Sequence, residues 1–131
     1  MVKWLRRENG QSYLEAALVF PILIFLLMGA LDLGRAFNAQ IVVMNAAREG
    51  ARYGIAHSAD TAGIQAQVLQ ATTGTGITVN PSNIVVTYPN GRVAGKPIRV
   101  QVTHNFQFLV GMLLGANSTP VSAAAEMGII Q

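Results

Sequence analysis

The chain has 131 residues and a mass of 13.9 kDa, which is enough for one small domain and excludes a multidomain enzyme. Charged residues make up only 11% of it and hydrophobic residues 51%, which excludes both a disordered tail and a water-exposed surface of ordinary composition. The net charge of +3 is too thinly spread for a nucleic-acid-binding surface, and a sequence without cysteine has no disulfide framework, thiolate metal site or cysteine nucleophile.

The apolar residues are concentrated near the N-terminus. Residues 16–31 read AALVFPILIFLLMGAL, 16 residues without a charge between Glu15 and Asp32. As a helix this segment is about 24 Å long, slightly less than the hydrocarbon core of a bilayer at roughly 30 Å. We therefore expect a membrane-spanning segment that needs local thinning of the bilayer or a protein partner. A buried core helix is the alternative, although so small a chain has little to surround it with. Pro21 removes one backbone hydrogen bond inside the segment, which predicts either a kink or a tolerated transmembrane proline.

Positive charge predominates before this segment. Three basic residues precede it, Lys3, Arg6 and Arg7. The opposing charges of Asp32 and Arg35 follow it, so the positive-inside rule predicts a cytoplasmic N-terminus and an exported remainder. A secretory signal would need a cleavage site such as residues 34–36, Gly-Arg-Ala, where the central arginine disfavours cleavage.

An amphipathic helix is predicted to continue the apolar one. Residues at steps of three or four form a single apolar stripe, Leu33, Phe37, Ile41, Met44, Ala47, Ala51 and Ile55. Beside it, Ala46, Gly50 and Gly54 recur every four residues and allow another helix, or the sheet of the same chain, to approach the backbone closely. A helix from Ser12 to Ile55 would be about 66 Å long, so we expect it to pack lengthwise against other helices.

The residues after Ile55 predict a small α+β head. Ser58 or Asp60 begins a second helix, which ends near Gly74. Strands are predicted over residues 84–88, 98–104 and 121–129, with the turn-rich loop 89–96 making the first two a hairpin and residues 106–114 forming a loop or one helical turn. The predicted fold class is therefore α+β, a long N-terminal helix, transmembrane and then amphipathic, packed on a small antiparallel sheet.

No residue pattern indicates catalysis. His57, Ser58 and Asp60 are the residue types of a hydrolase triad, but they are sequence neighbours at a helix start. His57 and His104 lack the spacing of a metal site. We therefore predict no catalytic residue, cofactor or metal ligand. Asn117 begins an Asn-Ser-Thr glycosylation sequon, which we interpret as a turn.

Glu15 is the most informative residue of the N-terminal region. A carboxylate beside a membrane-spanning helix is costly without a partner, so such a residue indicates function. One structural explanation is a capping box, Ser12-Tyr13-Leu14-Glu15, in which Glu15 accepts a hydrogen bond from a backbone N–H at the helix start. The functional explanation begins at Gly10. Basic residues, a glycine, an acid five positions later and an apolar helix form a pattern that ordinary anchors and secretory signals do not require.

This pattern resembles the class III signal of type IV pilin-like proteins, in which a prepilin peptidase cuts after glycine on the cytoplasmic side of the membrane. The resemblance implies cleavage between Gly10 and Gln11 and pairing of Glu15 with the N-terminal amine of a neighbouring subunit. Residues 6–54 are also similar to the TadE-like family of tight-adherence pilus proteins, through the apolar segment, Asp-Leu-Gly-Arg at 32–35 and NAAREGARY at 45–53.

The resemblance implies a pilin-like fold and a non-enzymatic role, with a leader at residues 1–10, a long helix at 11–56 and a head at 57–131. We expect a minor pilin, pseudopilin or assembly factor of a tight-adherence pilus, which sits in the bacterial inner membrane with its head exported and reaches the cell-surface pilus after assembly. Its expected partners are that membrane, a prepilin peptidase and other pilin-like subunits or copies of itself. The alternatives are the major subunit of a homopolymeric filament, an uncleaved single-span anchor that displays a binding head, and a secreted enzyme that begins near Phe37.

Overall fold

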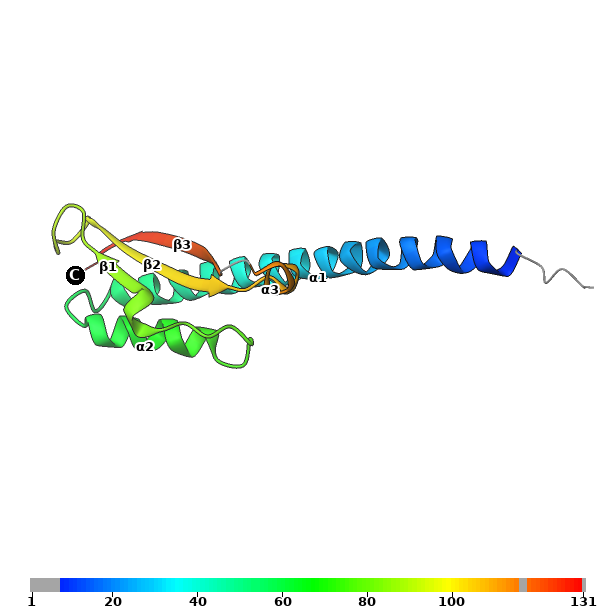
Figure 1. Ribbon diagram of the computed structural model, residues 1–131. Helices are drawn as coiled ribbons and strands as arrows, with labels where there is room; N and C mark the ends of the chain where they lie inside the picture. Colours follow the sequence, from blue (N-terminus) through cyan, green and yellow to red (C-terminus); the bar gives the residue numbers. More distant parts are fainter. Residues whose placement is uncertain (1–7, 116–117, 131) are drawn as a thin grey trace, which may run out of the picture.

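The computed structural model describes residues 8–115 and 118–130. The basic residues of the expected leader, Lys3, Arg6 and Arg7, lie outside the described residues, as does Asn117. The elements follow in the order α1 (Glu8–Gly54), α2 (Thr61–Thr72), a short 3₁₀ turn η1 (Pro81–Asn83), β1 (Ile84–Thr87), β2 (Pro97–Phe106), α3 (Leu109–Leu114) and β3 (Thr119–Gly128). Figure 1 shows a rod and a head, because α1 is much longer than the rest and its second half carries the other elements.

The sheet is antiparallel with the strand order β1-β2-β3, so β2 is central. Val86 of β1 and Ala125 of β3 both lie opposite Val100 of β2. Along β2, Ile98, Val100 and Val102 are fully buried while Arg99 is exposed, which is the period-2 alternation of a strand with one face on a core. The three strands lie within two residues of their predicted bounds, and the predicted α+β class is confirmed.

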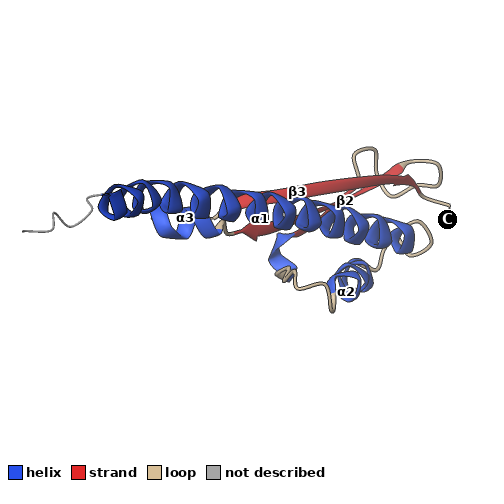
Figure 2. Ribbon diagram, turned by 90° about the vertical axis from the view of Figure 1, so that its right-hand side faces the viewer, coloured by secondary structure: helices blue, strands red, loops and turns tan. Residues whose placement is uncertain are grey.

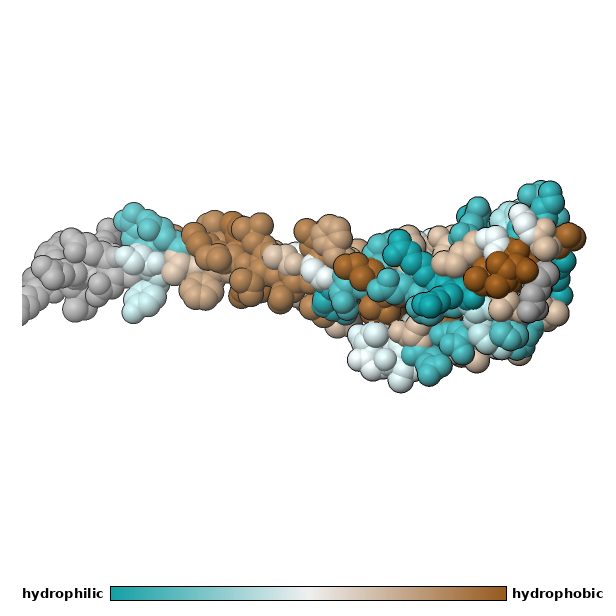
Figure 3. All heavy atoms as spheres, turned by 180° about the vertical axis from the view of Figure 1, so that it is seen from behind, coloured by the Kyte–Doolittle hydropathy of each residue, from teal (hydrophilic) through white to brown (hydrophobic). Residues whose placement is uncertain are grey.

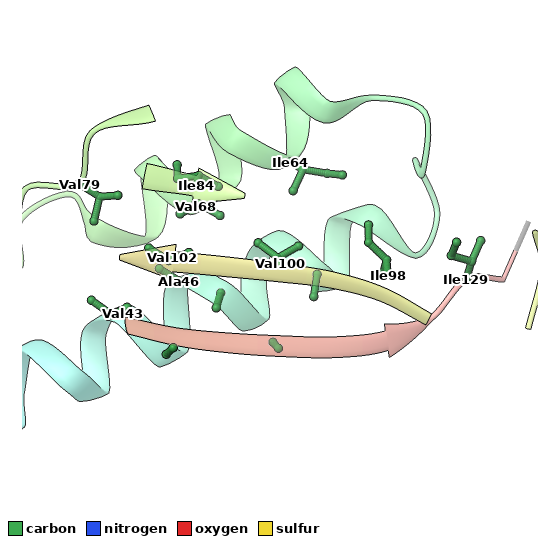
Figure 4. Close-up of a cluster of buried hydrophobic side chains, with 14 residues drawn as sticks. Val43, Ala46, Ile64, Val68, Val79, Ile84, Ile98, Val100, Val102 and Ile129 are labelled. Atoms are coloured by element: carbon green, nitrogen blue, oxygen red, sulfur yellow. The ribbon is translucent and has the colours of Figure 1, made fainter. Parts of the chain in front are cut away.

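The core lies between α1, α2 and the sheet (Figure 4). The largest fully buried side chains are Ile64, Ile98, Val43, Val68, Val100 and Val102, each of which stabilises the fold by roughly 1.5–3 kcal/mol through burial. The second half of α1 contributes mainly alanine and glycine, so its backbone comes close to these branched side chains. A Cβ added at Gly50 would lie 2.5 Å from Cγ2 of Val68, a spacing that only glycine avoids without movement of the core.

The turn between α1 and α2 is fixed by Asp60, one of the two predicted caps. Oδ1 of Asp60 accepts a hydrogen bond from the backbone N–H of Gly63 at 2.8 Å, and Oδ2 accepts one from the hydroxyl of Tyr53 at 2.9 Å. The first bond caps α2 and the second ties this cap to the last turn of α1.

The start of α1 differs from the prediction. The helix begins at Glu8 and not at Ser12, so Ser12 and Glu15 both lie inside it and the predicted capping box does not form. Residues 8–11 contain no proline and are helical. The backbone N–H groups from Ser12 onward therefore have carbonyl partners four residues earlier in the same helix. Oε1 of Glu15 instead accepts a hydrogen bond from the side-chain amide of Gln11, one turn earlier, at 3.2 Å.

Candidate functional site

The first half of α1 extends away from the head as a bare apolar rod. Within residues 10–31 every residue is exposed except Met28, which is half-buried. Figure 3 shows the hydrophobic surface of this half as a band that reaches the more polar head. By length and composition α1 is able to cross a membrane, and no residue of its most apolar 18-residue window is buried in protein. A core helix would be buried, so that alternative is excluded.

Three of the predicted site residues, Gly10, Gln11 and Glu15, lie on the first two turns of this rod. A Cβ added at Gly10 would meet no atom within 4 Å, in contrast to one at Gly50, so packing among the described residues does not explain a glycine at position 10. Glu15 is exposed and its carboxylate reaches only the Gln11 amide among the hydrogen bonds described for it. The ion pairs of the described residues, Asp32–Arg35 and Arg99–Glu126, do not include it.

Pro21 lies in the middle of the exposed apolar segment. The helix is continuous on both sides of it, although a proline has no N–H to donate to the carbonyl of Ala17. A loosened hydrogen-bond ladder at this point stays a prediction.

The residues predicted for helix packing do not share one environment in the structure. Phe37 and Ile41 are 63% and 60% exposed, whereas Ala46, Gly50 and Gly54 are buried and Met44 is half-buried. Phe37 precedes Ala46 by nine residues, which at about 100° per residue puts them on opposite sides of the helix.

The buried alanine and glycine residues contact the chain's own head. Added Cβ atoms at Gly50 and Gly54 would meet side chains of α2 and β2. Of the two partners left open by the sequence for this close approach, the structure therefore places the chain's own sheet and second helix there. The opposite face, at Phe37 and Ile41, is not covered in this way by any part of the chain that the structure describes.

A cluster that the sequence did not predict joins the rod to the head. Asp32 is only 3% exposed, and its Oδ1 accepts a hydrogen bond from Nη1 of Arg35 at 3.0 Å. Its Oδ2 accepts one from the backbone N–H of Val110, in the first turn of α3, also at 3.0 Å. The Arg35 guanidinium lies 5.1 Å from the ring centroid of Phe106 and donates to the carbonyl of Gln107 at 3.4 Å. The sequence signal for this cluster was the spacing of Asp32 and Arg35, three residues apart at the end of an apolar segment.

The two histidines have separate structural surroundings. The ring of His57 stacks on Tyr53 with the centroids 4.5 Å apart. Nδ1 of His104 lies 2.8 Å from the carbonyl oxygen of Thr78, within hydrogen-bond distance. Over residues 8–115 and 118–130, no group of three or more His, Asp or Glu side chains is arranged to hold a metal ion.

Comparison with known proteins gives a family match for most of α1. Residues 10–52 match the family model described as TadE-like protein, and the match begins at Gly10 and ends two residues before the end of α1. Searches of the curated proteins and of the solved structures gave no significant match. A match to this family suggests a protein associated with tight-adherence pili, and members of the family are typically structural. The resemblance to the TadE-like family drawn from the sequence is thus confirmed by a match to the family model over residues 10–52.

Proposed function

We propose that this protein is a non-enzymatic, pilin-like subunit, a minor pilin, pseudopilin or assembly factor of a tight-adherence pilus. The observation that carries the proposal is the bare first half of α1, which is apolar, exposed over residues 10–31 and attached to a folded head. Such a rod is compatible with two environments, a bilayer before assembly and a bundle of neighbouring helices after it. In this proposal the N-terminus is cytoplasmic, the head is exported, and the assembled subunit reaches the cell surface.

Cleavage after Gly10 by a prepilin peptidase gives Gly10 and Glu15 their roles. No packing contact within residues 8–115 and 118–130 explains a glycine at position 10, which supports a requirement outside the fold. After cleavage Gln11 carries a new α-amine, and Glu15 provides a carboxylate for the amine of a neighbouring subunit. Each of these charges is costly in an apolar bundle without the other, so their pairing fixes the register of one helix against the next.

The exposed side of α1 beside the head supplies a second contact. Phe37 and Ile41 are 63% and 60% exposed and lie four residues apart. The opposite face of the helix is occupied by the chain's own α2 and β2, which supports the assignment of these two residues to contacts with another subunit.

The N-terminal residue of the protein from its native membrane or pilus fraction is the first test. Intact mass and terminal sequencing should give Gln11 as the first residue. An intact Met1 would contradict processing and favour the uncleaved anchor. A terminus near Phe37 would favour a secreted protein without the apolar rod.

Glu15→Ala tests assembly separately from membrane insertion. The variant should still enter the membrane, because the apolar segment at residues 16–31 is unchanged, but should be lost from the pilus fraction. Glu49→Ala is the matched control, since Glu49 is an exposed glutamate on the same helix beyond the rod. Normal incorporation of Glu15→Ala into pili would contradict the proposed pairing.

The relative amounts of subunits decide between the minor subunit and the alternative of a homopolymeric filament. Quantitative mass spectrometry of purified pili should find this chain at a small fraction of the major component. If the chain is itself the major component, the homopolymeric alternative is correct and the helix contacts above are between identical copies.

A further inference from the structure

The short helix α3 presents a compact apolar surface to the outside of the molecule. Met112, Leu113 and Leu114 are 73%, 64% and 71% exposed. The chain has no Asp, Glu, Lys or Arg between Arg99 and Glu126, so the sequence around α3 lacks the charges that an ordinary water-exposed loop carries. Three adjacent large apolar side chains on one helical turn, in a sequence without nearby charge, indicate a contact with an apolar environment outside the chain.

The position of α3 indicates what that environment is. Figure 2 shows α3 beside α1 where the head begins. Gly29 and Leu33 of α1 face Val110 and Leu114 across an apolar groove of about 330 Å³. This groove coincides with the end of the apolar segment at Leu31, so the surface of α3 continues the apolar surface of the rod.

The hydrogen bonds of Asp32 hold α3 at this level. Asp32 is the first charged residue after the apolar segment, and α3 covers it and donates the backbone N–H of Val110 to it. A bare carboxylate at this depth would meet lipid, whereas this one is paired with Arg35 and buried. The left-handed conformation of Gly115, with φ of +73°, then ends α3 and turns the chain toward β3.

The length of the apolar segment agrees with this arrangement. At about 24 Å it is roughly 6 Å shorter than a typical hydrocarbon core. α3 lies beside the end of the segment nearest the head, where Asp32 interrupts the apolar surface. At that end, the apolar side chains of α3 extend the surface that is compatible with lipid.

We propose that α3 is a lipid-contacting element, in which Met112, Leu113 and Leu114 insert into the head-side interface of the bilayer next to α1. This inference rests on the proposed membrane placement of residues 16–31. Before assembly, the element would fix the depth and tilt of the head relative to the membrane, because the Asp32 hydrogen bonds couple α3 rigidly to the rod.

Site-specific fluorescence in the full chain tests the proposal. The sequence has no cysteine, so Leu113→Cys introduces one thiol for an environment-sensitive dye at a position whose side chain is already exposed. Leu23→Cys in the apolar segment and Val93→Cys in the loop between β1 and β2 are matched controls, with 54% and 60% exposure. Each labelled protein is reconstituted into phosphatidylcholine–phosphatidylglycerol vesicles, with and without bromines on the upper acyl chain.

The expected result is a blue-shifted emission and a loss of intensity in brominated vesicles for the dyes at 23 and 113, and neither change for the dye at 93. Quenching at 23 with a water-like, unquenched dye at 113 would overturn the α3 inference alone. Quenching at neither position would overturn the membrane placement and this inference with it. A blue shift at 113 that is insensitive to bromine and disappears on dilution with lipid would mean that a second copy of the chain covers α3, which also overturns the inference.

Discussion

The close packing of α1 on the head predicts opposite effects for the same substitution at two glycines of one helix. Alanine at either Gly34 or Gly50 should gain roughly 0.5–1 kcal/mol from helix propensity and reduced freedom of the unfolded chain. At Gly34 the new Cβ would meet no atom within 4 Å, so this gain should appear as increased stability. At Gly50 it would lie 2.5 Å from Cγ2 of Val68 and 3.2 Å from Cγ1 of Val100, both on stiff β-branched side chains. Overpacking of this kind costs about 1–3 kcal/mol.

The free energy of unfolding should therefore be about 1–3 kcal/mol lower for Gly50→Ala than for Gly34→Ala, since the propensity gain is common to both. Hydrogen exchange of the buried strand β2 by mass spectrometry, in the detergent-solubilised full chain at several urea concentrations, measures this difference. Equal stability of the two variants would refute the reasoning, because it would mean that α1 does not lie against Val68 and Val100.

Three further predictions concern the core, the helix cap and the uncovered face of α1. Ile64→Ala should lower the free energy of unfolding by about 2–5 kcal/mol, whereas Val85→Ala, at a 49% exposed position of β1, should change it by less than about 1 kcal/mol in the same exchange experiment. The bond from the Gly63 N–H, helped by the Tyr53 hydroxyl, holds the pKa of Asp60 below its ordinary value of 3.8. Its contribution to stability is therefore present above that value and lost as the pH falls through the lower folded-state pKa. Asp60→Asn keeps a side chain that can cap α2 but has no carboxylate to titrate. Its melting temperature should therefore fall less than that of the unsubstituted protein between about pH 5 and about pH 2, the range over which carboxylates titrate. Phe37→Ser should leave the stability of the isolated protein within about 0.5 kcal/mol and reduce incorporation into pili, measured by immunoblot of the pilus fraction.

The elements of the fold were predictable from the sequence because each has a local signal. The apolar run at residues 16–31 and the three-and-four spacing after it predict one long helix, and the alternation along residues 98–104 predicts the central strand. The helix start at Glu8 was missed because the capping-box pattern at Ser12 is also compatible with a helix interior, and nothing in residues 8–11 stops a helix.

The surfaces of α1 were less predictable, because burial on a helix depends on what the rest of the chain covers. Residues 33–55 are apolar on more than one side, and periodicity alone does not say which side the head occupies. The head takes the face of Ala46 and Gly50, where small residues permit close approach, and leaves Phe37 exposed. The bond between Asp32 and Val110 joins residues 78 positions apart, a separation at which no local pattern operates.

The exposed apolar residues beyond the membrane segment bear on the choice between a subunit and an anchor. Ile41 lies ten residues after Leu31, so its Cα is roughly 15 Å further along α1. The headgroup layer adds only about 5–7 Å on each side of the hydrocarbon core, and an upright helix therefore carries Ile41 beyond the lipid. Phe37 and Ile41 are nevertheless 63% and 60% exposed, on the side of α1 that the head does not cover. A simple anchor leaves the Ile41 side chain in water, whereas a neighbouring helix in an assembled pilus buries it, and this difference favours the pilin-like subunit.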